Sequence, residues 1–266
     1  VGCFRNDTNT EKNHGGPPYA PVNPADERTD EFLKKYLKDL SQAFESDYWH
    51  LGGDEVSIGC VKDLSPTQDF LKTHNLKIDQ LQQYYVKTER DILKNISPKS
   101  HAGYWYRGGS TKYAKGDILQ NWGGSGTLRS IFEKYPDNYV INSPASTYYL
   151  DCGYTNQYGG SSWCGGIHNW KIIWDQDPSL LYDSNPIFKS KFLGSELPLW
   201  SEMNNEFNMP LKLFPRGAAM SYRMWNPKEP EMFVNVVEMM VKHQYRLKAY
   251  GIPCSRVTQR YCEKHL

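Results

Sequence analysis

The stretch that decides the fold runs from Tyr48 to Val56 and reads Tyr-Trp-His-Leu-Gly-Gly-Asp-Glu-Val. A short apolar run is followed by two glycines and two adjacent carboxylates. Successive strand residues point to opposite faces, so Asp54 and Glu55 can serve one ligand only at a strand end, where glycine lets the backbone bend. Such a pair favours general acid/base chemistry. The alternative is the first turn of a helix, where acidic residues are common.

Length and charge limit the classes of protein to which the chain can belong. It has 266 residues, a net charge of +1 and a pI near 7.7, which suits one large domain or two small ones. The balanced charge argues against a nucleic-acid partner and against a polybasic membrane surface. No apolar run reaches about 18 residues, so we expect no membrane span. The chain opens on Val1-Gly2-Cys3, without signal-peptide features, which predicts a mature or processed product.

The cysteines predict an oxidising compartment. The chain has six of them, and their spacing does not indicate zinc, so we expect no metal site. An even set with two short spacings favours three disulfides over free thiols: Cys3–Cys60, Cys152–Cys164 and Cys254–Cys262. Glycosylation sequons at Asn6 and Asn95 also fit the secretory pathway.

Strand and helix patterns alternate along the chain. Strands are expected near residues 47–52, 101–106, 118–122, 139–143 and 191–197, and helices over about 24–44, 67–73, 78–93, 127–135, 215–224 and 229–250. Residues 1–23 read as an extended surface segment and residues 145–190 as a long loop. Such alternation predicts a parallel sheet. Because a (β/α)₈ barrel needs eight strands in roughly 250 residues, the chain is either an open sheet or the later part of a barrel.

Aromatic and acidic residues follow the predicted strands, where ligands bind in such folds. The chain is rich in rings, with 8 Trp and 19 Tyr, and tryptophans at several strand ends can stack on a sugar. Taken singly, a strand-end Trp is more often core and a loop acid is more often solvated. The candidates are Asp54, Glu55, Trp105, Trp122, Tyr149, Asp151, Trp200 and Glu202.

His50-Leu-Gly-Gly-Asp-Glu-Val56 resembles the signature of the family 20 glycoside hydrolases, the β-N-acetylhexosaminidases. Further family-like pieces follow in the family's order, so the resemblance spans almost the whole chain. They are Trp105, Ile118-Leu-Gln-Asn-Trp122, Ser143-Pro-Ala-Ser-Thr-Tyr-Tyr149-Leu-Asp151, Gly194-Ser-Glu-Leu-Pro-Leu-Trp200-Ser-Glu202, Phe214-Pro-Arg216 and Arg223-Met-Trp225. The chain departs from the pattern at Tyr106-Arg107, where the family has Gln-Glu, and at Tyr222, where it has Glu.

The resemblance implies a (β/α)₈ TIM barrel. Residues 1–266 would be the C-terminal portion of a single catalytic domain and would supply about strands 4–8 and the C-terminal helices. The family places three strands and a small N-terminal domain before the Asp-Glu strand, and this chain lacks them. Because an open sheet edge is a liability in water, we expect a second polypeptide that carries the N-terminal strands, most simply a product of proteolytic processing. A dimer of the assembled enzyme and a lysosomal or secreted location also fit the resemblance.

The implied activity is that of a retaining exo-β-N-acetylhexosaminidase. It would remove terminal non-reducing GlcNAc or GalNAc from glycoconjugates by substrate-assisted catalysis, without a cofactor. Glu55 would act as general acid and then base, while the substrate's own acetamido oxygen forms an oxazolinium intermediate. Asp54 would hold the acetamido nitrogen and Tyr149 the acetamido oxygen. The pocket wall would be Trp105, Trp122 and Trp200, with Asp151 and Glu202 accepting hydrogen bonds from sugar hydroxyls.

Three other interpretations stay open. The chain could belong to a retaining glycosidase with a protein nucleophile, to a non-catalytic carbohydrate-binding protein on a hexosaminidase-like barrel, or to a barrel piece without activity. The combination of Asp54, Glu55 and Tyr149 disfavours a lectin, because a lectin has no need of an acid.

Overall fold

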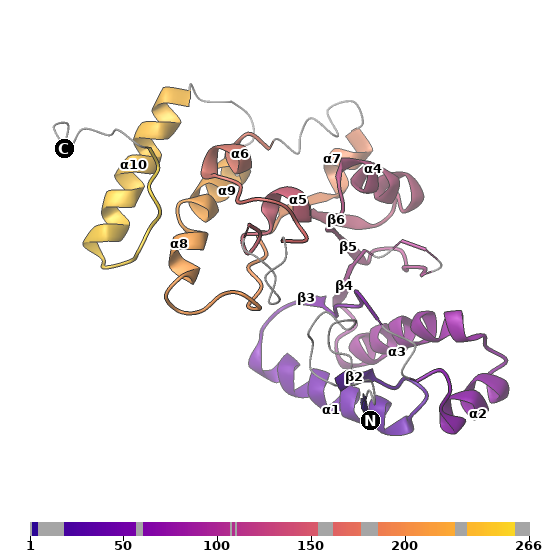
Figure 1. Ribbon diagram of the computed structural model, residues 1–266. Helices are drawn as coiled ribbons and strands as arrows, with labels where there is room; N and C mark the ends of the chain where they lie inside the picture. The colour runs from indigo at the N-terminus through magenta and orange to yellow at the C-terminus, as the bar shows by residue number, and fades with distance from the viewer. Residues whose placement is uncertain are drawn as a thin grey trace. The chain divides into compact units, whose positions relative to one another are not determined.

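The computed structural model describes residues 2–4, 19–56, 61–106, 108–109, 111–153, 162–176, 186–226 and 233–258. The chain divides into two compact units (Figure 1). The first unit comprises Val1–Gln120 with Asp137–Tyr139, and the second comprises Asn121–Pro136 with Val140–Leu266.

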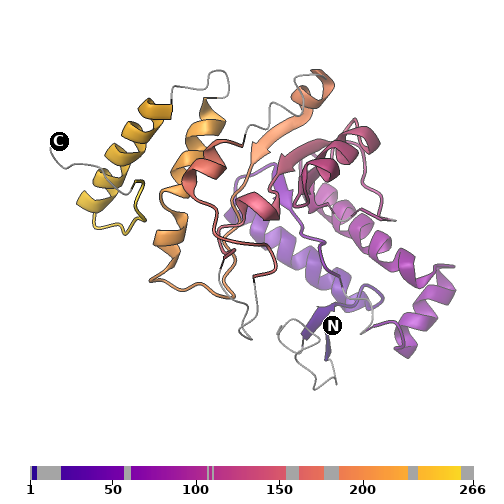
Figure 2. The same ribbon diagram turned by 45° about the horizontal axis from the view of Figure 1, so that its top comes forward.

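The first unit joins a parallel sheet to helices (Figure 2). In chain order its elements are β1 (Gly2–Phe4), β2 (Tyr19–Val22), α1 (Glu27–Ala43), β3 (Tyr48–His50), α2 (Ser65–Thr73), the 3₁₀ turn η3 (Ile78–Gln80), α3 (Leu81–Ile96), β4 (His101–Trp105) and β5 (Ile118–Asn121). β1 and β2 pair antiparallel. β3, β4 and β5 pair parallel in that order, with Tyr48 opposite His101 and Gly103 opposite Ile118.

Helix α1 begins where the sequence supplies a capping acid. The Asp26 carboxylate accepts the Arg28 backbone N–H at 3.0 Å, which satisfies one of the free donors of the first turn. Leu33 and Leu37, one helical turn apart, are buried in a cluster with Ile92 of α3, and α1 packs against α3. The apolar stripe of α1 therefore fixes the helix against its neighbour.

A buried acid lies in α3. The Glu89 side chain is 5% exposed, and its Oε2 atom has no hydrogen-bond partner. Burial raises the pKa of Glu89 to about 8, although a hydrogen bond with Tyr85 lowers it. A buried carboxyl without full hydrogen bonding favours its protonated form.

The second unit is mainly helical, with one described parallel strand pair. Its elements are α4 (Ser125–Lys134), β6 (Tyr139–Asn142, whose first residue belongs to the first unit), α5 (Ala145–Tyr148), α6 (Trp170–Trp174), α7 (Pro186–Lys191), β7 (Phe192–Ser195), α8 (Met209–Leu213), α9 (Arg216–Trp225) and α10 (Phe233–Ala249). β6 and β7 run parallel. α6 packs against α9, and the Trp170 indole donates to the Val257 carbonyl at 2.8 Å.

Every segment that we predicted as a strand contains one, and each predicted helix is present with shifted ends. The prediction of a continuous loop over residues 145–190 is wrong, because that range contains α5, α6 and the start of α7. Helix α8 was also missed. These helices have only four to six residues each, which is too short for a helical period to be recognised. Among the described residues, no helix is both long enough and apolar enough to cross a bilayer.

Candidate active site

In the first unit, the ladder between β3 and β4 continues past the end of β3. The Leu51 N–H donates to the Gly103 carbonyl at 2.8 Å, and the Trp105 N–H donates to the Gly52 carbonyl at 3.0 Å. The backbone is therefore held as a strand up to Gly52, so the residues that follow leave from a fixed point at the carboxyl end of the sheet.

Beyond that point the chain turns through positive φ angles, at Gly52 (76°), Gly53 (93°) and Glu55 (45°). Glycine adopts such angles without steric penalty, whereas Glu55 does so against its ordinary preference. The Gln82 amide donates to the Gly53 carbonyl at 3.0 Å. Asp54 and Glu55 are both exposed, and neither carboxylate has a hydrogen-bond partner among the described residues.

Trp105 stands at the end of β4, beside this turn. Its side chain is half-buried and meets His50 edge to face, with 5.1 Å between the ring centroids. The Tyr113 hydroxyl donates to the Trp105 carbonyl at 3.4 Å. The first unit therefore brings the Asp54-Glu55 turn and Trp105 to the carboxyl ends of two adjacent strands.

In the second unit, Tyr149 lies at the centre of a group of aromatic rings. Its side chain is 5% exposed. The rings of Trp163 and Trp200 meet it edge to face, at centroid distances of 5.7 Å and 6.0 Å. Trp122 packs against the same cluster. Three residues predicted for the site, Trp122, Tyr149 and Trp200, therefore lie together.

Asp151 joins this group through the backbone of Trp200. The Trp200 N–H donates to Asp151 Oδ1 at 3.4 Å. Burial raises the pKa of the half-buried Asp151 carboxyl; backbone hydrogen bonds lower it, and the negative charge of Glu202 raises it again. Glu202 itself is exposed. An acid in this setting can accept hydrogen bonds from a polar ligand while most of its own surface is shielded from water.

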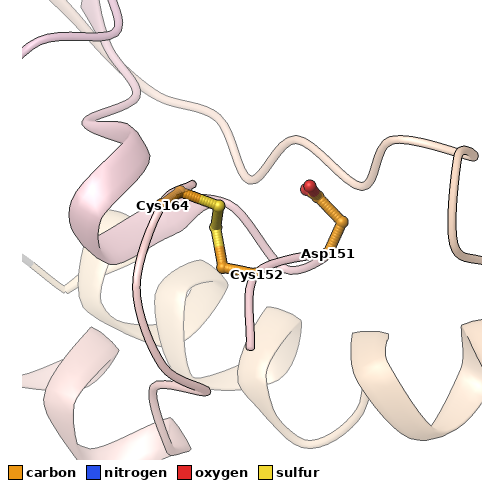
Figure 3. A group of neighbouring side chains, drawn as sticks. All are labelled: Asp151, Cys152 and Cys164. Atoms are coloured by element: carbon orange, nitrogen blue, oxygen red, sulfur yellow. A yellow bond between two sulfur atoms is a disulfide. The ribbon is translucent and has the colours of Figure 1, made fainter. Parts of the chain in front are cut away.

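Cys152 and Cys164 form a disulfide across a separation of 12 residues, as predicted. The two sulfur atoms and a carboxylate oxygen of Asp151 all lie within 4.8 Å of one another (Figure 3). Because the thiolate is the form of cysteine that binds metals, sulfurs bonded to each other are poor ligands. This group is therefore a cross-link beside an acid rather than a metal centre.

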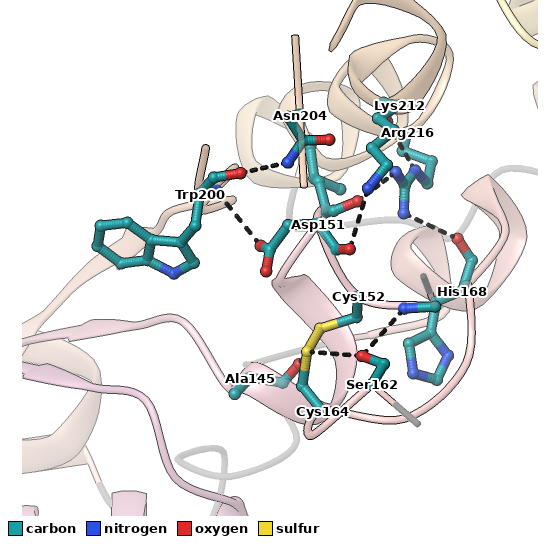
Figure 4. Close-up of a disulfide and its surroundings, with 12 residues drawn as sticks. Ala145, Asp151, Cys152, Ser162, Cys164, His168, Trp200, Asn204, Lys212 and Arg216 are labelled. Carbon is teal, nitrogen blue, oxygen red and sulfur yellow. Dashed lines mark hydrogen bonds between the residues drawn. A yellow bond between two sulfur atoms is a disulfide. The ribbon is translucent and has the colours of Figure 1, made fainter. Parts of the chain in front are cut away.

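Two buried cations contact the backbone that follows Tyr149 (Figure 4). Lys212 on α8 donates to the Asp151 carbonyl at 3.0 Å. Arg216 on α9 donates to the Leu150 carbonyl and to the Lys212 carbonyl, each at 2.7 Å. The two side chains are 4% and 6% exposed, respectively. Burial lowers the pKa of Lys212 to about 8, against the opposing effect of Asp151.

Sequence reasoning assigned no site role to Trp163, Lys212 or Arg216. The position of Trp163 next to Cys164 could have revealed it, because the predicted disulfide brings the two ends of that loop together. A single lysine in a short helix gives no such signal, and Arg216 entered only as part of a family-like motif.

The remaining predictions concern the glycosylation sequons and the other cysteines. Asn95 is exposed near the end of α3, as a glycosylation site requires. Cys254 carries a free thiol, although we expected it to pair with Cys262, which lies outside the described residues. Cys60, Asn6 and the side chain of Cys3 lie outside them as well, so the Cys3–Cys60 pairing and the Asn6 sequon stay predictions.

Residues 2–228 match the model of glycosyl hydrolase family 20, catalytic domain. The chain belongs to this family. The catalytic domain of the family is a TIM barrel, and the parallel strands and surrounding helices described above have the α/β character of that fold.

Individual relatives agree with this assignment. The chain is 25% identical to human beta-hexosaminidase subunit beta over 248 residues, which is 92% of this chain and 42% of the relative. It is 26% identical to the chitooligosaccharidolytic beta-N-acetylglucosaminidase of Ostrinia furnacalis over 264 residues, or 92% of this chain and 43% of the relative. This family 20 chain therefore spans less than half the length of these curated relatives.

Solved structures show the same fold. The family 20 exo beta-N-acetylglucosaminidase of Vibrio harveyi, in complex with N-acetylglucosamine, superimposes with a TM-score of 0.76 at 21% identity. The match covers 90% of this chain and 37% of that one. The beta-N-acetylhexosaminidase of Streptomyces coelicolor gives a TM-score of 0.69 at 20% identity, with coverage of 92% and 47%.

Proposed function

We propose that this family 20 chain is part of a retaining exo-β-N-acetylhexosaminidase, which releases terminal GlcNAc or GalNAc from glycoconjugates. The observation that carries the proposal is the Asp54-Glu55 pair, delivered by the Gly52-Gly53 turn at the carboxyl end of β3. A strained, solvent-facing acid at a strand end is an arrangement used for chemistry more than for stability. The names of the human and Ostrinia furnacalis relatives support the same activity.

In the proposed mechanism, Glu55 protonates the glycosidic oxygen and the substrate's acetamido oxygen attacks the anomeric carbon. Asp54 accepts a hydrogen bond from the acetamido nitrogen and offsets the positive charge that develops there. Glu55, now ionised, takes a proton from the water that opens the oxazolinium ring. Family 20 enzymes are an exception to the scheme of two carboxylates flanking one bond, so adjacent acids suffice, because Asp54 serves the acetamide and not the glycosidic bond.

The aromatic group of the second unit supplies the remaining roles. Tyr149 donates to the acetamido oxygen, and Asp151 and Glu202 accept hydrogen bonds from sugar hydroxyls. Trp122 and Trp200, together with Trp105 of the first unit, provide apolar faces for a sugar ring. The contacts of Tyr149 and Asp151 with Trp200 support this assignment.

A second polypeptide carrying about three N-terminal barrel strands completes the enzyme in this proposal, and this chain supplies about strands 4–8 of the barrel. Within the described part of the first unit, β3 pairs with β4 on one side only. Its Tyr48 is 62% exposed, and the neighbouring aromatic side chains Phe32, Tyr36 and Phe44 are also exposed. An unpaired strand edge flanked by exposed rings fits a surface that another strand covers.

The expected setting is the lysosome or the extracellular space. The Cys152–Cys164 disulfide needs an oxidising compartment for its formation, and the exposed Asn95 lies in a sequon. A dimer of the assembled enzyme belongs to the same proposal.

The test is hydrolysis of a chromogenic N-acetyl-β-glucosaminide, measured beside the native mass of the purified protein. Activity together with a mass well above 30.8 kDa supports both the activity and the partner. Activity with a product of inverted anomeric configuration contradicts the retaining mechanism. Binding of N-acetylglucosamine without hydrolysis, by material that contains the partner, favours a carbohydrate-binding protein instead.

A further inference from the structure

The segment from Leu150 to Asp151 is fixed from several directions. The Leu150 N–H donates to the Pro198 carbonyl at 2.8 Å, and its carbonyl accepts from Arg216 at 2.7 Å. The Asp151 carbonyl accepts from Lys212 at 3.0 Å, and its carboxylate accepts from the Trp200 N–H at 3.4 Å. Both backbone carbonyls of this two-residue segment therefore accept from side chains of α8 and α9.

The donors to the two carbonyls are charged and buried, although a carbonyl group does not need a charged donor. A neutral donor such as water or an amide satisfies a carbonyl, whereas burial of a lysine is unfavourable unless its charge is compensated. The lowered pKa of Lys212 reflects this penalty. Burial raises the pKa of the Asp151 carboxyl, and the attraction of Lys212 opposes that rise. The charge of Lys212 therefore acts on the carboxylate as well as on the carbonyl.

We propose that Lys212, supported by Arg216, is a positioning residue that holds Leu150 and Asp151 so that Tyr149 and the Asp151 carboxylate meet the bound sugar in the correct orientation. This inference rests on the proposed function. Lys212 itself contacts no substrate; it acts through its hydrogen bond to the Asp151 carbonyl and through its positive charge close to the Asp151 carboxylate. Arg216 connects this segment to α8, because it donates to the Leu150 carbonyl and also to the Lys212 carbonyl.

The kinetic test compares three variants in the assembled, active enzyme. Lys212→Met removes the charge and the hydrogen bond but keeps the apolar stem. Lys212→Arg keeps both the charge and a donor. Lys242→Met is the matched control, because Lys242 is an exposed lysine of α10 paired with Glu238. We expect Lys212→Met to lower kcat/KM by on the order of 10²-fold, as misplaced binding groups do, Lys212→Arg to recover most of it, and Lys242→Met to change little.

Two readouts separate positioning from a merely structural role. In an Asp151→Asn background, Lys212→Met should cost less kcat/KM than it does in the wild type, because part of its effect passes through the Asp151 carboxylate. The acid limb of the kcat/KM profile should move to higher pH in Lys212→Met, since the Asp151 carboxyl then protonates more readily. Independent, additive losses and an unmoved acid limb would overturn the inference.

An NMR titration tests the link between Lys212 and Asp151 without an activity assay. In protein labelled with ¹⁵N-tryptophan, the Trp200 backbone amide should report the ionisation of Asp151, to which it donates. Its NMR titration midpoint should rise in Lys212→Met and not in Lys242→Met. If the wild type fails to hydrolyse any N-acetylhexosaminide, the proposed function fails, while this titration still tests the link between Lys212 and Asp151. If the wild type hydrolyses normally and the midpoint is unchanged, the inference alone fails.

Discussion

The segment Gly52–Glu55 of the first unit follows β3, whereas the segment Tyr149–Asp151 of the second follows β6 and the short helix α5, and the two are held by different means. The first depends on backbone conformation: positive φ angles at two glycines and at Glu55. The second depends on side chains from elsewhere in the chain: a disulfide, two buried cations and surrounding tryptophans. The carboxylates of the first are exposed, whereas Tyr149 is buried and Asp151 half-buried. A turn made by glycines leaves its acids open to solvent, and a cross-linked segment shields them.

The largest effect is expected where the chemistry would occur. Glu55→Gln keeps the shape of the exposed side chain but removes its ability to transfer a proton. Asp54→Asn removes the negative charge that offsets the positive charge developing on the acetamido nitrogen. Each should lower kcat by on the order of 10²–10⁴, measured with the chromogenic glucosaminide. Glu45→Gln, at an exposed glutamate of the same unit, is the control. Near-normal turnover in either of the first two variants would contradict the assigned roles.

Removal of the cross-link tests the second segment. The double variant Cys152→Ser/Cys164→Ser frees a loop closed over a separation of 12 residues, which should lower local stability by about 3 kcal/mol. Hydrogen exchange should therefore accelerate in α5 and around Tyr149, while α1 and α3 keep their wild-type protection. Equal acceleration in both units would show that the disulfide does not act on the second unit alone.

Stability in the first unit should depend on pH through Glu89. The carboxyl has a pKa near 4.5 in the unfolded chain and about 8 in the folded one. As pH rises between these values, the unfolded chain loses its proton first, so the folded state loses stability, by roughly 3–4 kcal/mol between pH 5 and pH 8. Hydrogen exchange of α3 amides at pH 5 and pH 8 measures the change.

A matched pair of variants tests whether Glu89 is the cause. Glu89→Gln should remove most of the pH dependence in α3, because an amide does not titrate in this range. Glu31→Gln, at an exposed position of α1, should leave it intact. A pH dependence that persists unchanged in Glu89→Gln would assign it to another group.

The smallest effect concerns the glycine turn. Gly53 has a φ of 93°, and an added Cβ would meet Tyr104 at an ordinary 3.7 Å, so strain in the backbone is the main penalty. Gly53→Ala should destabilise the first unit by about 1 kcal/mol. Gly126→Ala, inside α4 with open space around it, should instead stabilise the second unit by about 0.5 kcal/mol. Thermal unfolding of the two variants checks the opposite signs.

The difference between the segments also explains which parts could be predicted from sequence. Gly52, Gly53 and the acids that follow are neighbours in the chain, so a short stretch of sequence is enough to predict a turn that carries two acids. The strands were predictable for the same reason, since each is a compact run of apolar and aromatic residues ended by glycine or a polar residue.

The supports of the second segment come from residues far apart in sequence. Lys212 contacts Asp151 across 61 positions, and Arg216 contacts Leu150 across 66, so no local sequence pattern predicts these contacts. The burial of Glu89 could not be predicted either, because Glu89 lies between charged neighbours of α3 that suggest an exposed helix face. Trp163 needed the loop closure by Cys152 and Cys164 before its contact with Tyr149 could be foreseen.

The one-sided pairing of β3 has a practical consequence for production of the protein. Among the described residues β3 is an end strand of its sheet, and the exposed rings of Tyr48 and Phe44 lie beside it, so this edge is a template for association with another extended chain. Expressed without a covering strand, this polypeptide should form soluble oligomers or inclusion bodies rather than monodisperse material. Co-expression with the segment that supplies the adjoining strands is therefore the route by which we expect well-behaved protein to be obtained.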